Sequence, residues 1–121
     1  MTTTEKAEHK NLGSPDETRT FEKGVIELVH LDGGPVGRMI LQPGWKWSDD
    51  VKPIAQTESC LVPHAQYIIS GRLAIRMDDG DEFVLGPGDV ADIPPGHDGW
   101  VVGDEPVVGI DWTGFGNYAK A

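Results

Sequence analysis

The chain contains only one cysteine, Cys60, among 121 residues. A disulfide framework within the chain is therefore excluded. No apolar run approaches the roughly 20 residues that a membrane-spanning helix needs. The first ten residues, MTTTEKAEHK, also lack the apolar core of a secretory signal. We therefore expect a cytoplasmic protein with no membrane partner.

Basic residues are scarce as well. Ten lysines and arginines stand against 20 aspartates and glutamates, which gives a formal net charge of −10 and an isoelectric point near 4.6. A chain with this charge repels polyanions, so we expect no nucleic-acid partner and no anionic membrane surface. The composition, 38% hydrophobic and 25% charged in 13.1 kDa, is that of one globular domain.

Helical periodicity is missing, because glycine or proline interrupts every stretch that might carry it. Short apolar or alternating runs follow residue 21 instead: VIELVHL, VGRMILQ, ESCLV, YIIS, RLAIRM, EFVL, DVADI, WVV and PVVGIDW. They predict about nine strands and an all-β fold, a sandwich or a small barrel. Residues 1–20 have hardly any apolar side chains. We expect them to form a flexible tail before a β-barrel domain over residues 21–121.

One hairpin is expected at Asp79-Gly80, between the runs LAIRM and EFVL. An Asp-Gly pair supplies the positive φ angles of a tight type I′ turn. In the preceding run, alternation places Leu73 and Ile75 on one face and two arginines on the other. Such alternation is typical of a sheet with one buried face.

Four side chains are candidate ligands for a metal ion: Glu58, Cys60, His64 and His97. Strand alternation would place Glu58 and Cys60 on one face, and the two histidines stand beside strand-like runs. Carboxylate, thiolate and imidazole all bind divalent transition metals. The spacing alone is a weak pattern, since a lone cysteine is commonly a small buried apolar residue. A histidine beside proline often only caps a turn.

The runs HAQYIISGRL, GPGD and IPPGH resemble the motifs of the cupin superfamily, whose members are small jelly-roll β-barrels. The similarity covers roughly Gly44 to Trp112. It implies an all-β, cupin-type jelly-roll β-barrel whose motif-bearing core spans about residues 44–112.

The resemblance also implies a metal site, although the usual ligand pattern is altered. With the motifs aligned on their glycines, the family's two histidine positions of the first motif fall on Glu58 and Cys60, and its glutamate position falls on His64. The histidine position of the second motif falls on Gly99, and His97 stands two residues earlier with the same strand parity. The implied cofactor is a divalent transition metal, zinc, iron, manganese, nickel or copper, bound by Glu58, Cys60, His64 and His97.

Four further side chains are candidates for contact with an organic ligand: Gln66, Trp45, Trp47 and Trp100. Gln66 shares the parity of His64 and should face the barrel interior, where its amide would orient a ligand or a ligating imidazole. Trp45 and Trp47 are two residues apart, so their indoles should lie on one side of an extended segment. The alternatives are a structural hydrogen bond for Gln66 and core packing for the tryptophans.

Together these expectations favour a small cupin barrel that binds a divalent metal and a small organic molecule, as a metal-dependent dioxygenase or isomerase. The alternative is a metabolite-binding or sensor barrel without metal. Likeness of fold does not choose between them. We also expect a homodimer, in which the segment over residues 21–30 adds a strand to a neighbour's sheet.

Overall fold

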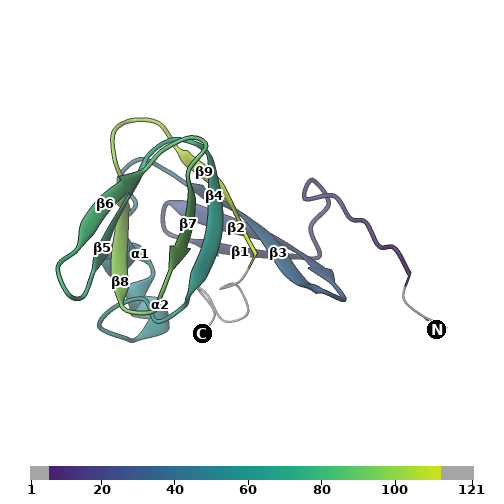
Figure 1. Cartoon of the computed structure of the whole chain (residues 1–121), viewed down its shortest axis with the longest axis horizontal. Helices are drawn as coiled ribbons and strands as arrows, with labels where there is room; N and C mark the ends of the chain where they lie inside the picture. The colour runs from purple at the N-terminus through teal and green to yellow at the C-terminus, as the bar shows by residue number, and fades with distance from the viewer. Residues whose placement is uncertain (1–5, 113–121) are drawn as a thin grey trace.

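The computed structural model describes residues 6–112, which form nine strands and two one-turn helices (Figure 1). None of these helices is long and apolar enough to cross a bilayer. The elements are β1 Glu17–Phe21, β2 Gly24–Leu31, β3 Gly34–Leu41, α1 Trp47–Asp50, α2 Lys52–Ala55, β4 His64–Ser70, β5 Leu73–Met77, β6 Glu82–Leu85, β7 Val90–Ile93, β8 His97–Val101 and β9 Val107–Asp111.

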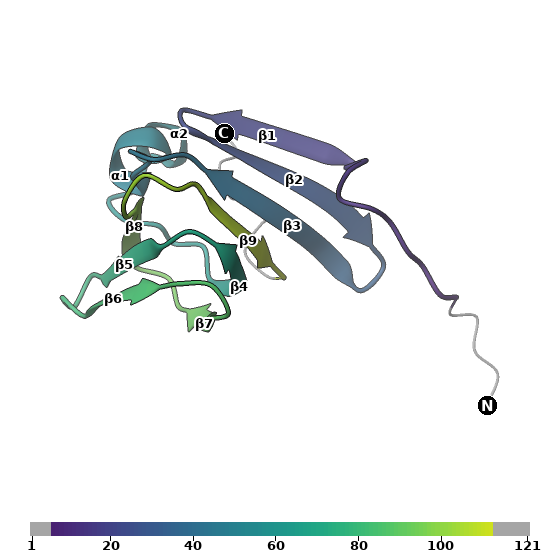
Figure 2. The same cartoon turned by 90° about the horizontal axis from the view of Figure 1, so that it is seen from above.

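The strands form two antiparallel sheets. One has six strands in the order β1-β2-β3-β9-β4-β7, and the other has three in the order β6-β5-β8. Strands β4 to β9 lie around the barrel interior, and β1, β2 and β3 continue the larger sheet and extend beyond it on one side (Figure 2). Ile26 of β2 and Met39 and Leu41 of β3 still face the interior. The expected all-β barrel is confirmed.

The core lies between the two sheets. Its fully buried members include Ile26, Leu28, Leu41, Ile68 and Ile93, each at most 2% exposed. Strand alternation explains which residues of each strand are buried, because alternate side chains of a strand point to the same face. Burying an isoleucine or leucine side chain contributes roughly 1.5 to 3 kcal/mol, so this cluster supplies much of the driving force for closing the barrel.

The expected hairpin joins β5 and β6, but its turn is not type I′. Gly80 has a φ of 96°, whereas Asp79 is not among the described non-glycine residues with positive φ. The Gly80 amide donates to the Met77 carbonyl at 2.9 Å, and the Met77 amide donates to the Asp81 carbonyl at 2.8 Å. The loop therefore has three residues and ends on a left-handed glycine, which relieves Asp79 of the positive φ that a type I′ turn requires.

The six-stranded sheet begins earlier than the sequence predicts. Strand β1 starts at Glu17, so residues 17–20 of the expected tail are paired with β2, in a register from Glu17↔Leu28 to Phe21↔Gly24. The run ETRTF has one apolar residue and gave no apolar signal; backbone pairing with β2 holds it in the sheet. Residues 1–5 of the expected tail and 113–121 of the expected domain lie outside the described residues.

The long connection between β3 and β4 is tied to the three-stranded sheet at two places. Lys46 and Cys60 form isolated bridges with Trp100 and His97, respectively. The Val101 amide also donates to the Trp45 carbonyl at 3.0 Å. These bonds place the connection along β8, with Cys60 beside its first residue and the segment of the two tryptophans beside its last two.

Candidate metal centre and ligand cavity

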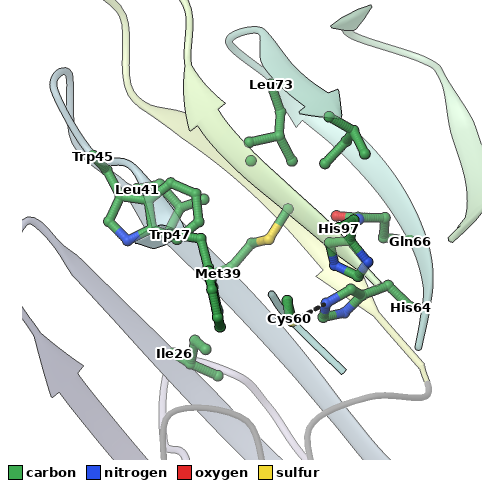
Figure 3. A pocket seen from close by; sticks show the side chains of 12 residues that line it. Ile26, Met39, Leu41, Trp45, Trp47, Cys60, His64, Gln66, Leu73 and His97 are labelled. Carbon is green, nitrogen blue, oxygen red and sulfur yellow. Dashed lines mark hydrogen bonds between the residues drawn. The ribbon is translucent and has the colours of Figure 1, made fainter. Parts of the chain in front are cut away.

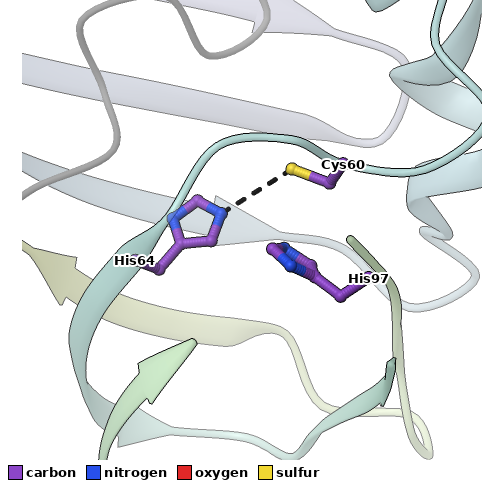
Figure 4. A group of neighbouring side chains, drawn as sticks. All are labelled: Cys60, His64 and His97. Carbon is purple, nitrogen blue, oxygen red and sulfur yellow. Dashed lines mark hydrogen bonds between the residues drawn. The ribbon is translucent and has the colours of Figure 1, made fainter. Parts of the chain in front are cut away.

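Cys60, His64 and His97 form a buried cluster, in which one ligand atom from each residue lies within 4.8 Å of the others (Figure 4). The three residues are 2%, 7% and 3% exposed. They come from the connection before β4, the first residue of β4 and the first residue of β8. The structure thus brings together three of the four metal ligands predicted from the sequence.

The inward direction of the two histidines follows from strand alternation. In β4, His64, Gln66 and Ile68 are buried and Tyr67 is exposed. In β8, His97, Gly99 and Val101 are the buried residues. Gln66 therefore shares a face with His64, and His97 shares one with Gly99, as the parity of the sequence predicts.

His64 is oriented by a buried carboxylate. Its Nδ1 lies 2.5 Å from Asp111 Oδ2, and Asp111 is 1% exposed. The contact is set by the sheet, because Asp111 of β9 is the register partner of Gln66 on β4. With Nδ1 donating to the carboxylate, Nε2 faces the Cys60 Sγ at 3.9 Å. A carboxylate that holds the far nitrogen of an imidazole is the usual support of a metal-binding histidine.

His97 is held by the backbone instead. Its Nδ1 donates to the Pro94 carbonyl at 2.9 Å. Burial lowers the pKa of His97 below its ordinary value of 6.5, which outweighs the raising effect of the bond to Pro94. The ring is therefore neutral at pH 7, with a lone pair on Nε2. The ring centroids of the two histidines are 5.3 Å apart.

Cys60 is a protonated thiol in the metal-free protein. Burial raises the pKa of the thiol to about 11, and the negative charges of Asp98 and Asp111 act in the same direction. A cation at the cluster would reverse this balance, because a coordinating thiol is deprotonated by the ion it binds.

The donor set of the cluster fits a divalent transition metal. In a tetrahedral zinc site with bonds of about 2.0 to 2.3 Å, neighbouring ligand atoms lie about 3.3 to 3.6 Å apart. The ligand atoms of the cluster lie within 4.8 Å of one another, so side-chain movements of up to about 1.2 to 1.5 Å would bring them to this spacing. One thiolate and two imidazoles suit zinc, copper or iron better than manganese. Three protein ligands leave a fourth position open, as in catalytic zinc sites.

Glu58, the fourth predicted ligand, lies outside the cluster. Its side chain is 98% exposed, and its Oε2 is 3.2 Å from Lys52 Nζ. Residues 57–59 form a bend and not a strand, so the alternation that was expected to align Glu58 with Cys60 does not apply.

Asp111 is the functional residue that sequence reasoning missed. A signal exists, since β9 alternates between buried and half-buried positions and places Asp111 on its buried face. An acidic residue at an inward position of a strand needs a partner. The partner is His64 because β9 lies beside β4, and the sequence does not reveal that neighbourhood.

A cavity adjoins the three residues (Figure 3). The space open to the centre of a water molecule is about 30 Å³, which is more than one water requires. Most of the wall is apolar. The lining residues are Ile26, Met39, Leu41, Trp45, Trp47, Cys60, His64, Gln66, Leu73, Ile75, His97 and Gly99.

Three of the four predicted ligand-contacting residues line this cavity. Trp45 and Trp47 are 4% and 2% exposed, and both are on the cavity wall, as their spacing predicts. Trp100 is not. It alternates with the inward residues of β8 and lies near two cations, with Lys46 Nζ at 5.6 Å and the Arg76 guanidinium at 5.7 Å from its ring. The prediction for Trp100 is therefore wrong, and its indole serves cation–π contacts.

Two buried polar atoms of the cavity wall have no hydrogen-bond partner among the described residues, Gln66 Oε1 and Trp45 Nε1. Gln66 is 3% exposed. Figure 3 shows its carboxamide oxygen directed toward the space between Met39 and Leu73. Buried polar groups are nearly always paired, so an unpaired acceptor on a cavity wall points to a water molecule or a ligand in the cavity.

Neither a family model nor a curated protein matches the chain. Solved structures do. A protein of unknown function from Rhizobium leguminosarum is 20% identical, with a TM-score of 0.63, over 90% of this chain and 97% of that one. A protein of unknown function from Acidithiobacillus ferrooxidans is also 20% identical, with a TM-score of 0.59, over 82% and 88%. A cupin-like protein from Thermotoga maritima is 18% identical, with a TM-score of 0.54, over 83% and 74%. At identities this low, the structural matches show a shared fold alone.

Proposed function

The chain has a cupin-type fold, and on this premise we propose that it binds a divalent transition metal through Cys60, His64 and His97 and a small organic molecule in the adjoining cavity. The observation that carries the proposal is the buried cluster of one thiol and two imidazoles with ligand atoms within 4.8 Å. Ordinary core packing does not explain the placement of three such groups at the end of an apolar cavity.

Each residue of the cluster has a defined task in this proposal. Asp111 and the Pro94 carbonyl hold the Nδ1 atoms of the two histidines, which leaves both Nε2 atoms for the metal. Cys60 loses its proton on metal binding, so affinity rises with pH. Gln66 and the apolar wall orient the organic molecule and exclude water from it.

A bound metal would supply Lewis acidity toward an oxygen of the organic molecule, or a site for dioxygen. The chemistry would then be that of a metal-dependent isomerase or dioxygenase. In a dioxygenase, Cys60 would be exposed to oxidation, because it would lie beside an oxygen-activating metal.

The second candidate is a metabolite-binding barrel without metal. The unpaired Gln66 Oε1 and the enclosed apolar wall favour it, because both suit an organic ligand whether or not a metal is present.

Elemental analysis of tag-free protein purified without chelator tests the metal site. We expect close to one metal ion per chain in the parent and none in a variant with His64→Ala and His97→Ala. His30→Ala is the matched control, because His30 lies on β2 with its side chain 51% exposed and near Glu17. Circular dichroism of all three proteins separates loss of the site from loss of the fold. A parent that takes up no zinc, iron, manganese, nickel or copper would refute the metal and favour the second candidate.

We also propose a homodimer. The segment first expected to pair with a neighbour, residues 21–30, is mostly β2, and β2 already pairs with β1 and β3. Within residues 6–112, the edge strands of the six-stranded sheet are instead β1 and β7. Strand addition at an edge is a common route to dimers. Sedimentation at micromolar concentration tests it, and a species of 13.1 kDa alone would contradict it.

A further inference from the structure

We infer that the organic molecule of this cavity is a small uncharged compound with an apolar body and a hydroxyl group, and that the hydroxyl donates a hydrogen bond to Gln66 Oε1. The inference rests on the proposed function, since it concerns the ligand of the same site. Three properties of the cavity carry it: its wall, its charge and its unpaired acceptor.

The wall sets the character of the body of the ligand. It is made largely of aliphatic side chains from both sheets, Ile26, Met39, Leu41, Leu73 and Ile75, with two indoles beside them. None of the five aliphatic residues is more than 7% exposed. A ligand gains affinity here in proportion to the apolar surface that it removes from water. A highly hydroxylated compound such as a sugar would leave most of its polar groups unpaired against this wall.

Charge excludes the common anionic and cationic metabolites. Among residues 6–112, those that line the cavity include no lysine, arginine, aspartate or glutamate. A carboxylate or ammonium that entered would lose its hydration without finding a counter-charge. The two charges of a divalent ion would be matched by the Cys60 thiolate and by the Asp111 carboxylate behind His64, and the apolar wall away from the ion would still offer a charged group no partner.

Gln66 selects the polar group of the ligand. Its Oε1 is a buried acceptor with no partner in the part of the chain that the structure describes, and it is directed into the cavity. Only a donor can satisfy it. A ketone, an ether or a hydrocarbon of the same shape leaves Oε1 unpaired, whereas a hydroxyl pairs with it. Sites built around a buried polar group discriminate strongly against analogues that lack its partner.

A matched series of five-membered rings tests the inference by direct binding. Cyclopentanol, cyclopentane, cyclopentanecarboxylate and cyclopentylamine are titrated into zinc-loaded and zinc-free protein and followed by chemical-shift changes of backbone amides. We expect cyclopentanol to bind most tightly, with the carboxylate and the ammonium at least about tenfold weaker. Gln66→Leu should weaken cyclopentanol binding about five- to tenfold and should not weaken cyclopentane binding, because it removes the acceptor that a hydrocarbon leaves unpaired.

The control variant is Gln42→Leu, because Gln42 is exposed at the end of β3 and absent from the cavity wall. It should bind the whole series as the parent does. Tightest binding of the carboxylate to zinc-loaded protein would overturn the inference while the metal site stands. Equal affinities for cyclopentanol and cyclopentane, or no binding of any member, would overturn it too. A cyclopentanol preference that depends on Gln66 in a protein that holds no metal would support it and refute only the metal.

Discussion

The two histidines of the site do the same task with different support. His64, on the six-stranded sheet, is held by the buried carboxylate of Asp111, whereas His97, on the three-stranded sheet, is held by the backbone carbonyl of Pro94. Both bonds occupy Nδ1 and leave Nε2 for the centre of the cluster. The large sheet therefore brings a carboxylate into direct contact with its histidine, whereas His97 is contacted by a backbone dipole and Asp98 of the small sheet acts on the site only through its charge.

This difference predicts which histidine is affected by a substitution and which by a change of pH. A carboxylate is removed by one isosteric substitution, while a main-chain carbonyl is not. Burial without a carboxylate also leaves His97 neutral, with its pKa lowered. Substitutions should therefore disturb the Asp111 side, and acid should disturb the His97 side.

The largest expected effect concerns Cys60, which lies between the two sides. A rise of its pKa from 9.0 to about 11 predicts about 100-fold less thiolate in the folded, metal-free protein than in the unfolded chain at pH 8. The pH dependence of the rate of reaction with a disulfide reagent measures this pKa, because the chain has one cysteine and because the limited access to the buried thiol lowers the rate at every pH. Similar rates before and after unfolding would contradict it. Asp111→Asn should raise the folded rate, since Asp111 helps to raise that pKa.

The next effect isolates the carboxylate. Asp111→Asn should lower metal affinity about 10- to 100-fold, because removing the partner of a ligating imidazole typically does so. Isothermal titration of zinc into metal-free protein measures the change. Asp92→Asn makes the same chemical change at an exposed position of β7 and serves as the control. Equal affinities of the two variants would mean that the contact of Asp111 with His64 does not support metal binding.

A smaller effect concerns pH. The ordinary pKa of a histidine in the unfolded chain is 6.5, and burial lowers that of folded His97. Below about pH 6.5 the unfolded state therefore binds more protons, so the free energy of unfolding falls as the solution is acidified. Denaturant unfolding of metal-free protein at pH 5 and pH 7 should show this loss, and His97→Gln should reduce it. An unchanged difference between the two pH values in that variant would contradict the assignment to His97.

The smallest expected effect concerns Glu58, which lies outside the cluster of Cys60, His64 and His97. Glu58→Gln should leave metal content unchanged and alter the free energy of unfolding by less than about 0.5 kcal/mol, because it removes only an exposed ion pair with Lys52. Elemental analysis and denaturant unfolding measure the two quantities. Loss of metal in this variant would show that Glu58 is a ligand after all. The site would then not depend on the two histidines and Cys60 alone.

Strand parity accounts for what the sequence predicts correctly about the site. Gln66 and His97 lie in regular strands, where a two-residue step returns to the same face, and both point inward. The same rule places Trp100 on the opposite face of β8, away from the cavity, because it is one residue from the inward Gly99. It fails for Glu58 because residues 57–59 form a bend.

The rest depends on which strands are neighbours. Asp111 meets His64 only because β9 lies between β3 and β4, a neighbourhood that no local pattern contains. The strand β1 was missed for a similar reason, since ETRTF owes its structure to pairing with β2 and not to its own apolar pattern. The turn at Asp79 shows that loop length, which follows from strand register, decides the turn type that an Asp-Gly pair adopts.

The bridge between Cys60 and His97 has a consequence for the speed of metal exchange. The amide of Cys60 donates to the His97 carbonyl at 2.7 Å, and the amide of Gly96 donates to the Cys60 carbonyl at 2.7 Å. Two proposed ligands far apart in the chain are thus joined by their backbones in the metal-free structure. An ion would leave when this bridge opens locally, so its residence time should follow the opening rate of the segment around Cys60 and not the global unfolding rate.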